Sequence, residues 1–75
     1  MCLTDLKPGM NGFIDTINCD ERLSKRLLAL GFVEGTKVKV KQIAPLVDSI
    51  ILNLRGFDLA MRKKDARRIL IRGVI

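Results

Sequence analysis

The chain has 75 residues, of which 48% are hydrophobic, and its 14 Lys and Arg against eight Asp and Glu give a formal net charge of +6 at pH 7. This length predicts a single domain, residues 1–75, and the apolar content excludes a disordered chain because burial can offset the entropy of ordering. The longest uncharged apolar stretch, residues 27–33, is far shorter than the roughly 20 residues that a membrane-spanning helix requires.

The first half of the chain predicts one strand followed by one helix. Lys7-Pro8-Gly9 is typical of a turn, and residues 13–17 predict a short strand. A helix should follow, because one face would carry Leu23, Leu27 and Leu30 at i, i+4 and i+7. Either Asn18 or Asp20 could cap the start of this helix, and Gly31 suits the left-handed position that often ends one.

The second half predicts strands separated by breaks. Residues 36–41 alternate strictly, with Val38 and Val40 on one face and lysines on the other. Pro45 indicates a break over residues 43–48, since proline cannot donate to a sheet ladder. The remaining expected segments are, in order, a strand over 50–54, a turn at Arg55-Gly56, a strand over 57–61, a helical turn over 63–66 and a strand over 68–74.

Five short strands with one helix inserted after the first predict a mainly β fold, a small sandwich or barrel. A barrel suits so short a chain, because closure removes exposed sheet edges. Three inward-facing sets should build the core, and the third of them consists of Phe57, Leu59 and Met61.

Enzyme chemistry and a resident metal or cofactor are not expected. The chain has no histidine, which removes the usual general base near neutral pH and leaves any cysteine-based zinc shell incomplete. Cys19, near the expected helix start and Arg22, weakly resembles an activated thiol, but a cysteine packed beside the first strand is the favoured interpretation. Cys2 and Cys19 are most simply reduced thiols of a cytoplasmic protein, with a Cys2–Cys19 bridge as the alternative. Met1-Cys2-Leu3 followed by charged residues shows no secretory signal.

A partner-binding surface is the best-supported kind of site. Leu28 lies well off the Leu23/Leu27/Leu30 face, and the loop at Pro45 and Leu46 places apolar groups where exposed patches often mark interfaces. Basic residues flank the helix position, so we expect an apolar docking patch with a basic rim. Its candidate residues are Arg22, Lys25, Arg26, Leu28, Pro45 and Leu46.

The alternative function is a small basic nucleic-acid-binding barrel. Two basic clusters could neutralise phosphates, one formed by Lys37, Lys39 and Lys41 and the other by residues 62–64 with 67–68. Binders of single strands also need aromatic platforms, and the chain has no Trp or Tyr. Lysines on an exposed strand also prevent edge-to-edge aggregation, and this is the favoured interpretation of the stripe. Nucleic acid is therefore not the expected partner.

The order and spacing of several short motifs are similar to those of the FeoA family, the small ferrous-iron-transport A proteins. The motifs are LKPG at 6–9, RLLALGF at 26–32, EGT at 34–36, APL at 44–46 and RGFDLAMR at 55–62. The resemblance implies an SH3-like barrel with a helix after the first strand. It also implies a non-enzymatic cytoplasmic accessory protein that docks on and modulates FeoB, a membrane ferrous iron transporter with a GTP-hydrolysing domain.

Three positions depart from the usual family pattern. Glu34 stands where the family usually has proline before Gly35, and Val47 and Ser49 replace a glycine and a second proline in the loop. We expect the Gly35 turn to survive with less rigidity. The loop conformation should change, because glycine permits backbone conformations that valine avoids, and proline fixes a φ that serine leaves free.

Overall fold

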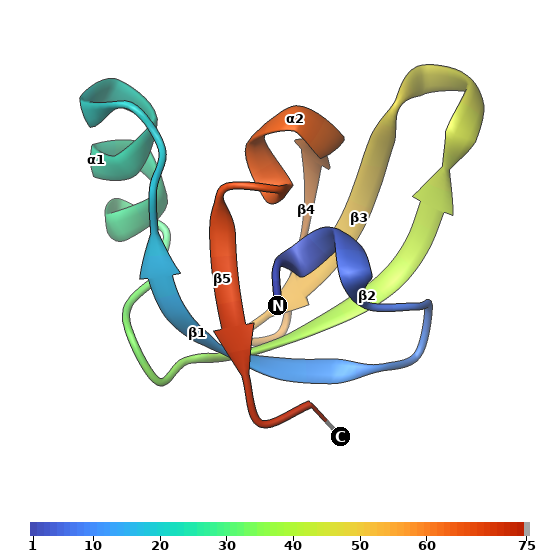
Figure 1. Cartoon of the computed structure of the whole chain (residues 1–75), viewed down its shortest axis with the longest axis horizontal. Helices are drawn as coiled ribbons and strands as arrows, with labels where there is room; N and C mark the ends of the chain where they lie inside the picture. The colour runs from blue at the N-terminus through green and yellow to red at the C-terminus, as the bar shows by residue number, and fades with distance from the viewer. Residues whose placement is uncertain (75) are drawn as a thin grey trace.

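Five antiparallel strands form the framework of the computed structural model, which describes residues 1–74 apart from the Pro45 side chain. They are β1 (Asn11–Ile17), β2 (Lys37–Ala44), β3 (Ser49–Leu54), β4 (Phe57–Arg62) and β5 (Ile69–Arg72), and they pair in the order β4-β3-β2-β1-β5. Helix α1 (Glu21–Ala29) follows β1, and the short α2 (Lys63–Ala66) links β4 to β5 (Figure 1). Two 3-10 turns, η1 (Leu3–Asp5) and η2 (Pro45–Val47), complete the described elements.

The predicted helix is confirmed, and the structure decides which residue caps it. The Leu23 N–H donates to the Asp20 carboxylate at 2.8 Å, so Asp20 rather than Asn18 begins the helix. Gly31 follows the helix with a φ of +101°, the left-handed conformation that the sequence indicated. Helix α1 is therefore bounded at both ends by local signals.

The break between β2 and β3 is shorter than predicted. Residues 43 and 44 still belong to β2, where Ile43 pairs with Ile50 and Ala44 pairs with Ser49. Proline removes a donor only at its own position, so the ladder continues up to Pro45. The last strand is also shorter than expected, because β5 covers residues 69–72 rather than 68–74.

The Arg55-Gly56 turn is confirmed as a two-residue hairpin loop. Both residues have positive φ, 51° and 88°, as the type I′ turn requires, and Leu54 pairs directly with Phe57 across it. Arginine occupies a conformation that Asn or Gly usually supplies, so the turn is held by the strands on either side of it.

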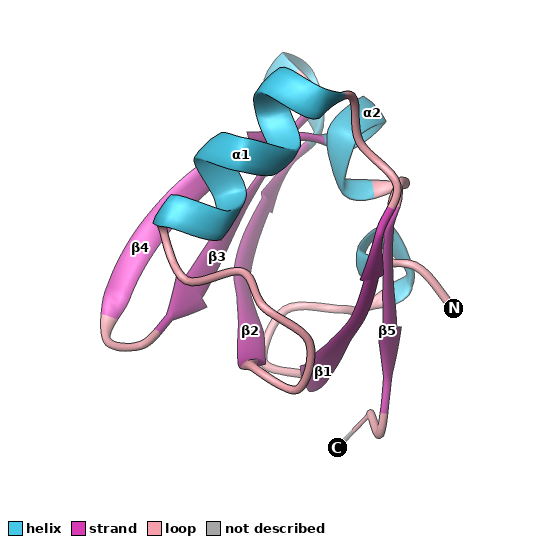
Figure 2. Ribbon diagram, turned by 90° about the vertical axis from the view of Figure 1, so that its left-hand side faces the viewer, coloured by secondary structure: helices cyan, strands magenta, loops and turns pink. Residues whose placement is uncertain are grey.

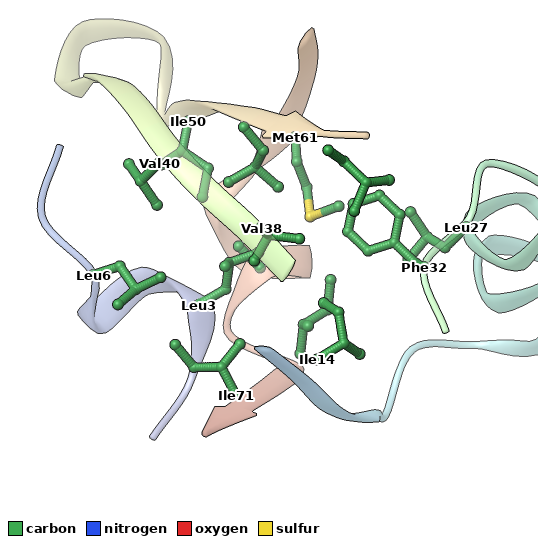
Figure 3. Packing of buried hydrophobic residues seen from close by; sticks show 14 residues of the cluster. Leu3, Leu6, Ile14, Leu27, Phe32, Val38, Val40, Ile50, Met61 and Ile71 are labelled. Atoms are coloured by element: carbon green, nitrogen blue, oxygen red, sulfur yellow. The ribbon is translucent and has the colours of Figure 1, made fainter. Parts of the chain in front are cut away.

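Apolar side chains alone fill the core, and no polar side chain of the described residues is buried. Figure 3 shows Leu27 and Phe32 on one side of this cluster and Leu3, Leu6 and Ile71 on the other. The third predicted inward set is only partly confirmed. Met61 is buried, Leu59 is half-buried, and Phe57 is 38% exposed because it lies at the turn end of an edge strand. The core residues are Leu3, Leu6, Ile14, Leu27, Phe32, Val38, Val40, Ile50, Leu52, Leu54, Met61, Ala66, Ile69 and Ile71.

The sheet curls but does not close, which corrects the expectation of a fully closed barrel. Figure 2 shows β4 and β5 at opposite ends of the curved sheet, and no pairing joins them. The chain passes from β4 to β5 through α2. The mainly β class and the inserted helix are confirmed, whereas closure is not.

No helix within residues 1–74 has both the length and the apolar character that crossing a membrane requires. Both cysteines are free thiols rather than a disulfide.

Candidate docking surfaces

Helix α1 presents four of the predicted docking residues. Leu28 is 59% exposed, because the helix turns Leu27 into the core and the next side chain therefore points outward. Lys25 forms an exposed ion pair with Glu21 at 3.1 Å, one helical turn away. Arg22 and Arg26 form no salt bridge with any described residue. At 100° per residue, Arg22 and Arg26 lie about 120° and about 160° around the helix from Leu28, so of the three basic residues only Lys25 lies beside the exposed leucine.

The β2–β3 loop presents the other predicted apolar group. Leu46 is 99% exposed and Val47 is 71% exposed, both within η2. The Pro45 side chain lies outside the described part of the structure. Asp48, with a φ of 50°, takes the left-handed position of the loop, so residue 47 does not need glycine here. Ser49 begins β3, and its hydroxyl donates a hydrogen bond to the Met61 carbonyl at 3.1 Å.

The structure does not gather the predicted residues into one patch. Figure 1 shows α1 on one side of the molecule and the η2 loop, at the tip of the β2–β3 hairpin, on the other. Leu28 with Lys25 forms what we call the helix patch, and Leu46 with Val47 forms the loop patch. Residue spacing could not reveal this separation, because it depends on the direction in which the hairpin leaves the sheet.

A groove between α1 and β4 is a feature that sequence reasoning missed. Its volume is about 380 Å³. The periodicity of the helix leucines and of the apolar residues of β4 predicted core positions, but Leu30 is 38% exposed and Leu59 is only half-buried. The helix therefore stands partly off the strand. The groove is lined by Leu23, Arg26, Leu27, Leu30, Leu59, Ala60, Met61, Arg62 and Asp65.

A wider, open cleft lies over the outer face of the sheet, and it carries basic residues. Lys37 and Lys39 line it together with Arg55, and none of the three forms a salt bridge with a described residue. The third lysine of the predicted stripe, Lys41, is instead paired with Asp58 at 3.1 Å. A hydrogen bond from Asn53 and the Lys41 ammonium group hold the pKa of Asp58 below its usual range. The stripe is thus divided between a paired and an unpaired part.

The weak candidate for thiol chemistry loses support. Burial raises the pKa of the Cys19 thiol, and the nearby Asp65 carboxylate adds to the rise. An activated thiol requires the opposite shift, because the thiolate is the nucleophile. The Cys19 thiol also lies 3.8 Å from the Asp65 carbonyl, consistent with a packed cysteine. Within residues 1–74, no three His, Cys, Asp or Glu side chains gather as metal ligands would.

Comparison with known proteins settles the family. The model of the FeoA domain matches residues 1–73. The chain belongs to the FeoA family. It is 32% identical over 69 residues to the Fe(2+) transport protein A/Fe(2+) transporter FeoB fusion protein of Porphyromonas gingivalis, and the match covers 92% of this chain but 8% of that protein.

Solved structures of FeoA proteins have the same fold. The FeoA protein from Chlorobium tepidum is 37% identical and matches with a TM-score of 0.89, over 95% of this chain and 68% of that one. FeoA from Stenotrophomonas maltophilia, solved as a zinc complex and described as a prokaryotic SH3 domain protein, is 21% identical with a TM-score of 0.83, over 96% of this chain and 89% of that one. These likenesses confirm the SH3-like fold and the family resemblance.

Proposed function

We propose that this FeoA-family protein is a non-enzymatic cytoplasmic accessory protein of ferrous iron uptake, which docks on a FeoB-type transporter and modulates it. The observation that carries the proposal is the relative from Porphyromonas gingivalis, in which a transport protein A segment and FeoB are parts of one chain. Fusion keeps two domains at a high effective concentration, an arrangement that is useful when they bind each other.

The exposed surface supports binding through contacts. The helix patch places the exposed Leu28 beside Lys25, so that an apolar group has a charged neighbour, as in many protein interfaces. The loop patch offers Leu46 at the tip of a projecting hairpin. Since the two patches are separate, each is a distinct candidate for the contact with the transporter.

The test measures binding of the purified protein to a full-length FeoB-type transporter in detergent by biolayer interferometry. We expect the wild type to bind, and Leu28→Asp or Leu46→Asp to weaken binding by about tenfold or more, because an acid replaces a buried apolar contact. Val33→Asp is a matched control, since Val33 is a partly exposed apolar residue outside both patches.

The results separate the patches from the proposal itself. If only one of the two variants loses binding to the transporter, the contact is assigned to the patch that carries that substitution. Equal binding by Leu28→Asp, Leu46→Asp and wild type rejects both patches, whereas no binding by the wild type rejects docking on the transporter.

Nucleic-acid binding is the second candidate, and the open basic cleft is the one observation in its favour. Lys37, Lys39 and Arg55 could contact phosphates there, but no aromatic side chain lines the cleft to stack a base. An oligonucleotide titration distinguishes this function, because binding should fall steeply as salt is raised. Absence of binding at low salt dismisses it.

A further inference from the structure

One edge of the sheet is left without a partner strand among residues 1–74. Strand β4 pairs with β3 on one side only, and no backbone hydrogen bond reaches its other side. The free side of β4 faces the groove beneath α1, so the exposed edge and the groove are parts of one surface. Exposed edges of this kind attract further strands, and proteins usually block them.

The turn geometry determines which backbone groups of β4 are free. In a two-residue hairpin, the residues flanking the turn exchange both hydrogen bonds, and such pairs alternate along the ladder. Leu54 and Phe57 flank the turn, so Asp58 and Ala60 direct their N–H and C=O groups away from β3. At the far end, the Lys63 N–H donates to the Asp48 carbonyl at 3.0 Å, as the same alternation requires. Asp58 and Ala60 are both solvent-exposed, and the same alternation directs the Arg62 N–H away from β3.

The lining of the groove indicates what kind of segment would fit. A strand added beside β4 would direct alternate side chains to the same face as Leu59 and Met61, opposite Leu27 and Leu30 of the helix. Apolar side chains at alternate positions suit that environment. The charged groups in the lining are Arg26, Arg62 and Asp65, and neither arginine is paired with a described carboxylate. This surplus of positive charge favours an acidic side chain in the incoming segment.

We propose that the groove between α1 and β4 accepts an extended, acidic segment of a protein partner, which adds to the sheet as a further strand beside β4. The identity of that partner, the FeoB-type transporter, rests on the proposed function. Main-chain hydrogen bonds from the edge supply affinity, and the groove selects the alternating side chains. A second copy of this chain suits the site less well, because the net charge of +6 and the two arginines would repel it.

A single substitution can remove one hydrogen-bond donor of the β4 edge and leave the rest of the sheet intact. Ala60→Pro deletes an N–H that points away from β3, and proline is tolerated on an edge strand in that orientation. Ala60→Ser is the matched control, because it keeps the N–H group. Binding of both variants to the full-length transporter in detergent is compared with wild type, and thermal unfolding confirms that each variant is folded. We expect Ala60→Ser to bind like wild type and Ala60→Pro to bind about tenfold more weakly or worse.

If Ala60→Pro does not fold, a variant with a reversed charge can still test the proposal. Arg62→Glu should also weaken binding by about tenfold, because it reverses one charge facing the acidic segment. Unchanged binding by both folded variants overturns strand addition and leaves docking on the transporter in place. Concentration-dependent dimerisation that Ala60→Pro abolishes would show that a second copy is the occupant, and would also overturn the inference.

If the transporter binds neither the wild type nor any variant, the proposed function is rejected. Strand addition to β4 can then be tested with a peptide alone. The probe is acetyl-Glu-Val-Thr-Val-Glu-amide, titrated into the isotope-labelled full chain and followed by NMR. Shifts concentrated at the amides of Asp58 and Ala60, and weaker shifts with the Lys analogue of the peptide, support the inference. Shifts elsewhere or none at all overturn it.

Discussion

The two edge strands of the sheet, β4 and β5, differ in what meets their outward-facing backbone groups. The outer side of β5 is covered by the N-terminal segment, where the Ile71 N–H donates to the Met1 carbonyl at 2.9 Å and Cys2 bridges to Leu70. The outer side of β4 meets no described backbone group, and the Ala60 N–H is left free. The covered edge stabilises the fold, whereas the open edge is available to a partner. A small domain can thus assign its two edges to different tasks.

The largest expected effect of this difference is on stability. Ile69 of β5 is fully buried and Leu59 of β4 is half-buried. Ile69→Ala should lower the free energy of unfolding by about 2–4 kcal/mol, whereas Leu59→Ala should lower it by about 1 kcal/mol, because less surface and a smaller cavity are involved. Urea denaturation of both variants measures the two values. Equal losses would show that β4 is anchored as firmly as β5.

The backbone contrast should appear directly in hydrogen exchange. The Ile71 and Ala60 amides both lie on outer edges, but only the Ile71 amide has a backbone acceptor. After each rate is divided by the intrinsic rate of that amide in an unfolded chain, the Ile71 amide should exchange about a hundredfold more slowly than the Ala60 amide. The reason is that the covering segment must open before the Ile71 amide can exchange. NMR exchange rates on the wild type give the comparison. Similar protection at the two amides would mean that the edges do not differ in solution.

The smallest expected effect concerns pH and the segment that covers β5. The Cys2 N–H donates to the Asp5 carboxylate at 2.9 Å, and this bond lowers the pKa of Asp5. A lowered folded-state pKa gives stability that is present above the ordinary value of about 3.9 and is lost as pH falls through the folded value. Protection at Ile71 should therefore decline below about pH 4, and Asp5→Asn should show less of this decline.

The control for the pH experiment is the open edge. Protection at Ala60 should not follow the titration of Asp5, since β4 does not contact the covering segment through any backbone hydrogen bond. If protection at both amides fell together as pH is lowered, the change would be global unfolding rather than loosening of the β5 edge.

Much of the fold could be predicted from the residues, because local signals are strong. Pro and Gly indicated the turns, and the Leu23/Leu27 spacing indicated the helix, with Asp20 as one of two possible caps. The candidate docking surfaces were harder to predict. Exposure of Leu28 and Leu46 followed from their positions in the pattern, but their placement on separate sides of the molecule did not. The α1–β4 groove was missed because the periodicity of Leu30 and Leu59 is that of core residues.

Residue types and their spacing alone predict the strand and turn order, the single longer helix, the apolar core and the positive charge. Those features depend on backbone preferences and periodicities that act over a few residues. Long-range packing leaves β4 and β5 unpaired, places residues 1–2 over one edge and sets α1 beside the other. These outcomes depend on contacts between segments far apart in the chain, and no short-range pattern specifies them.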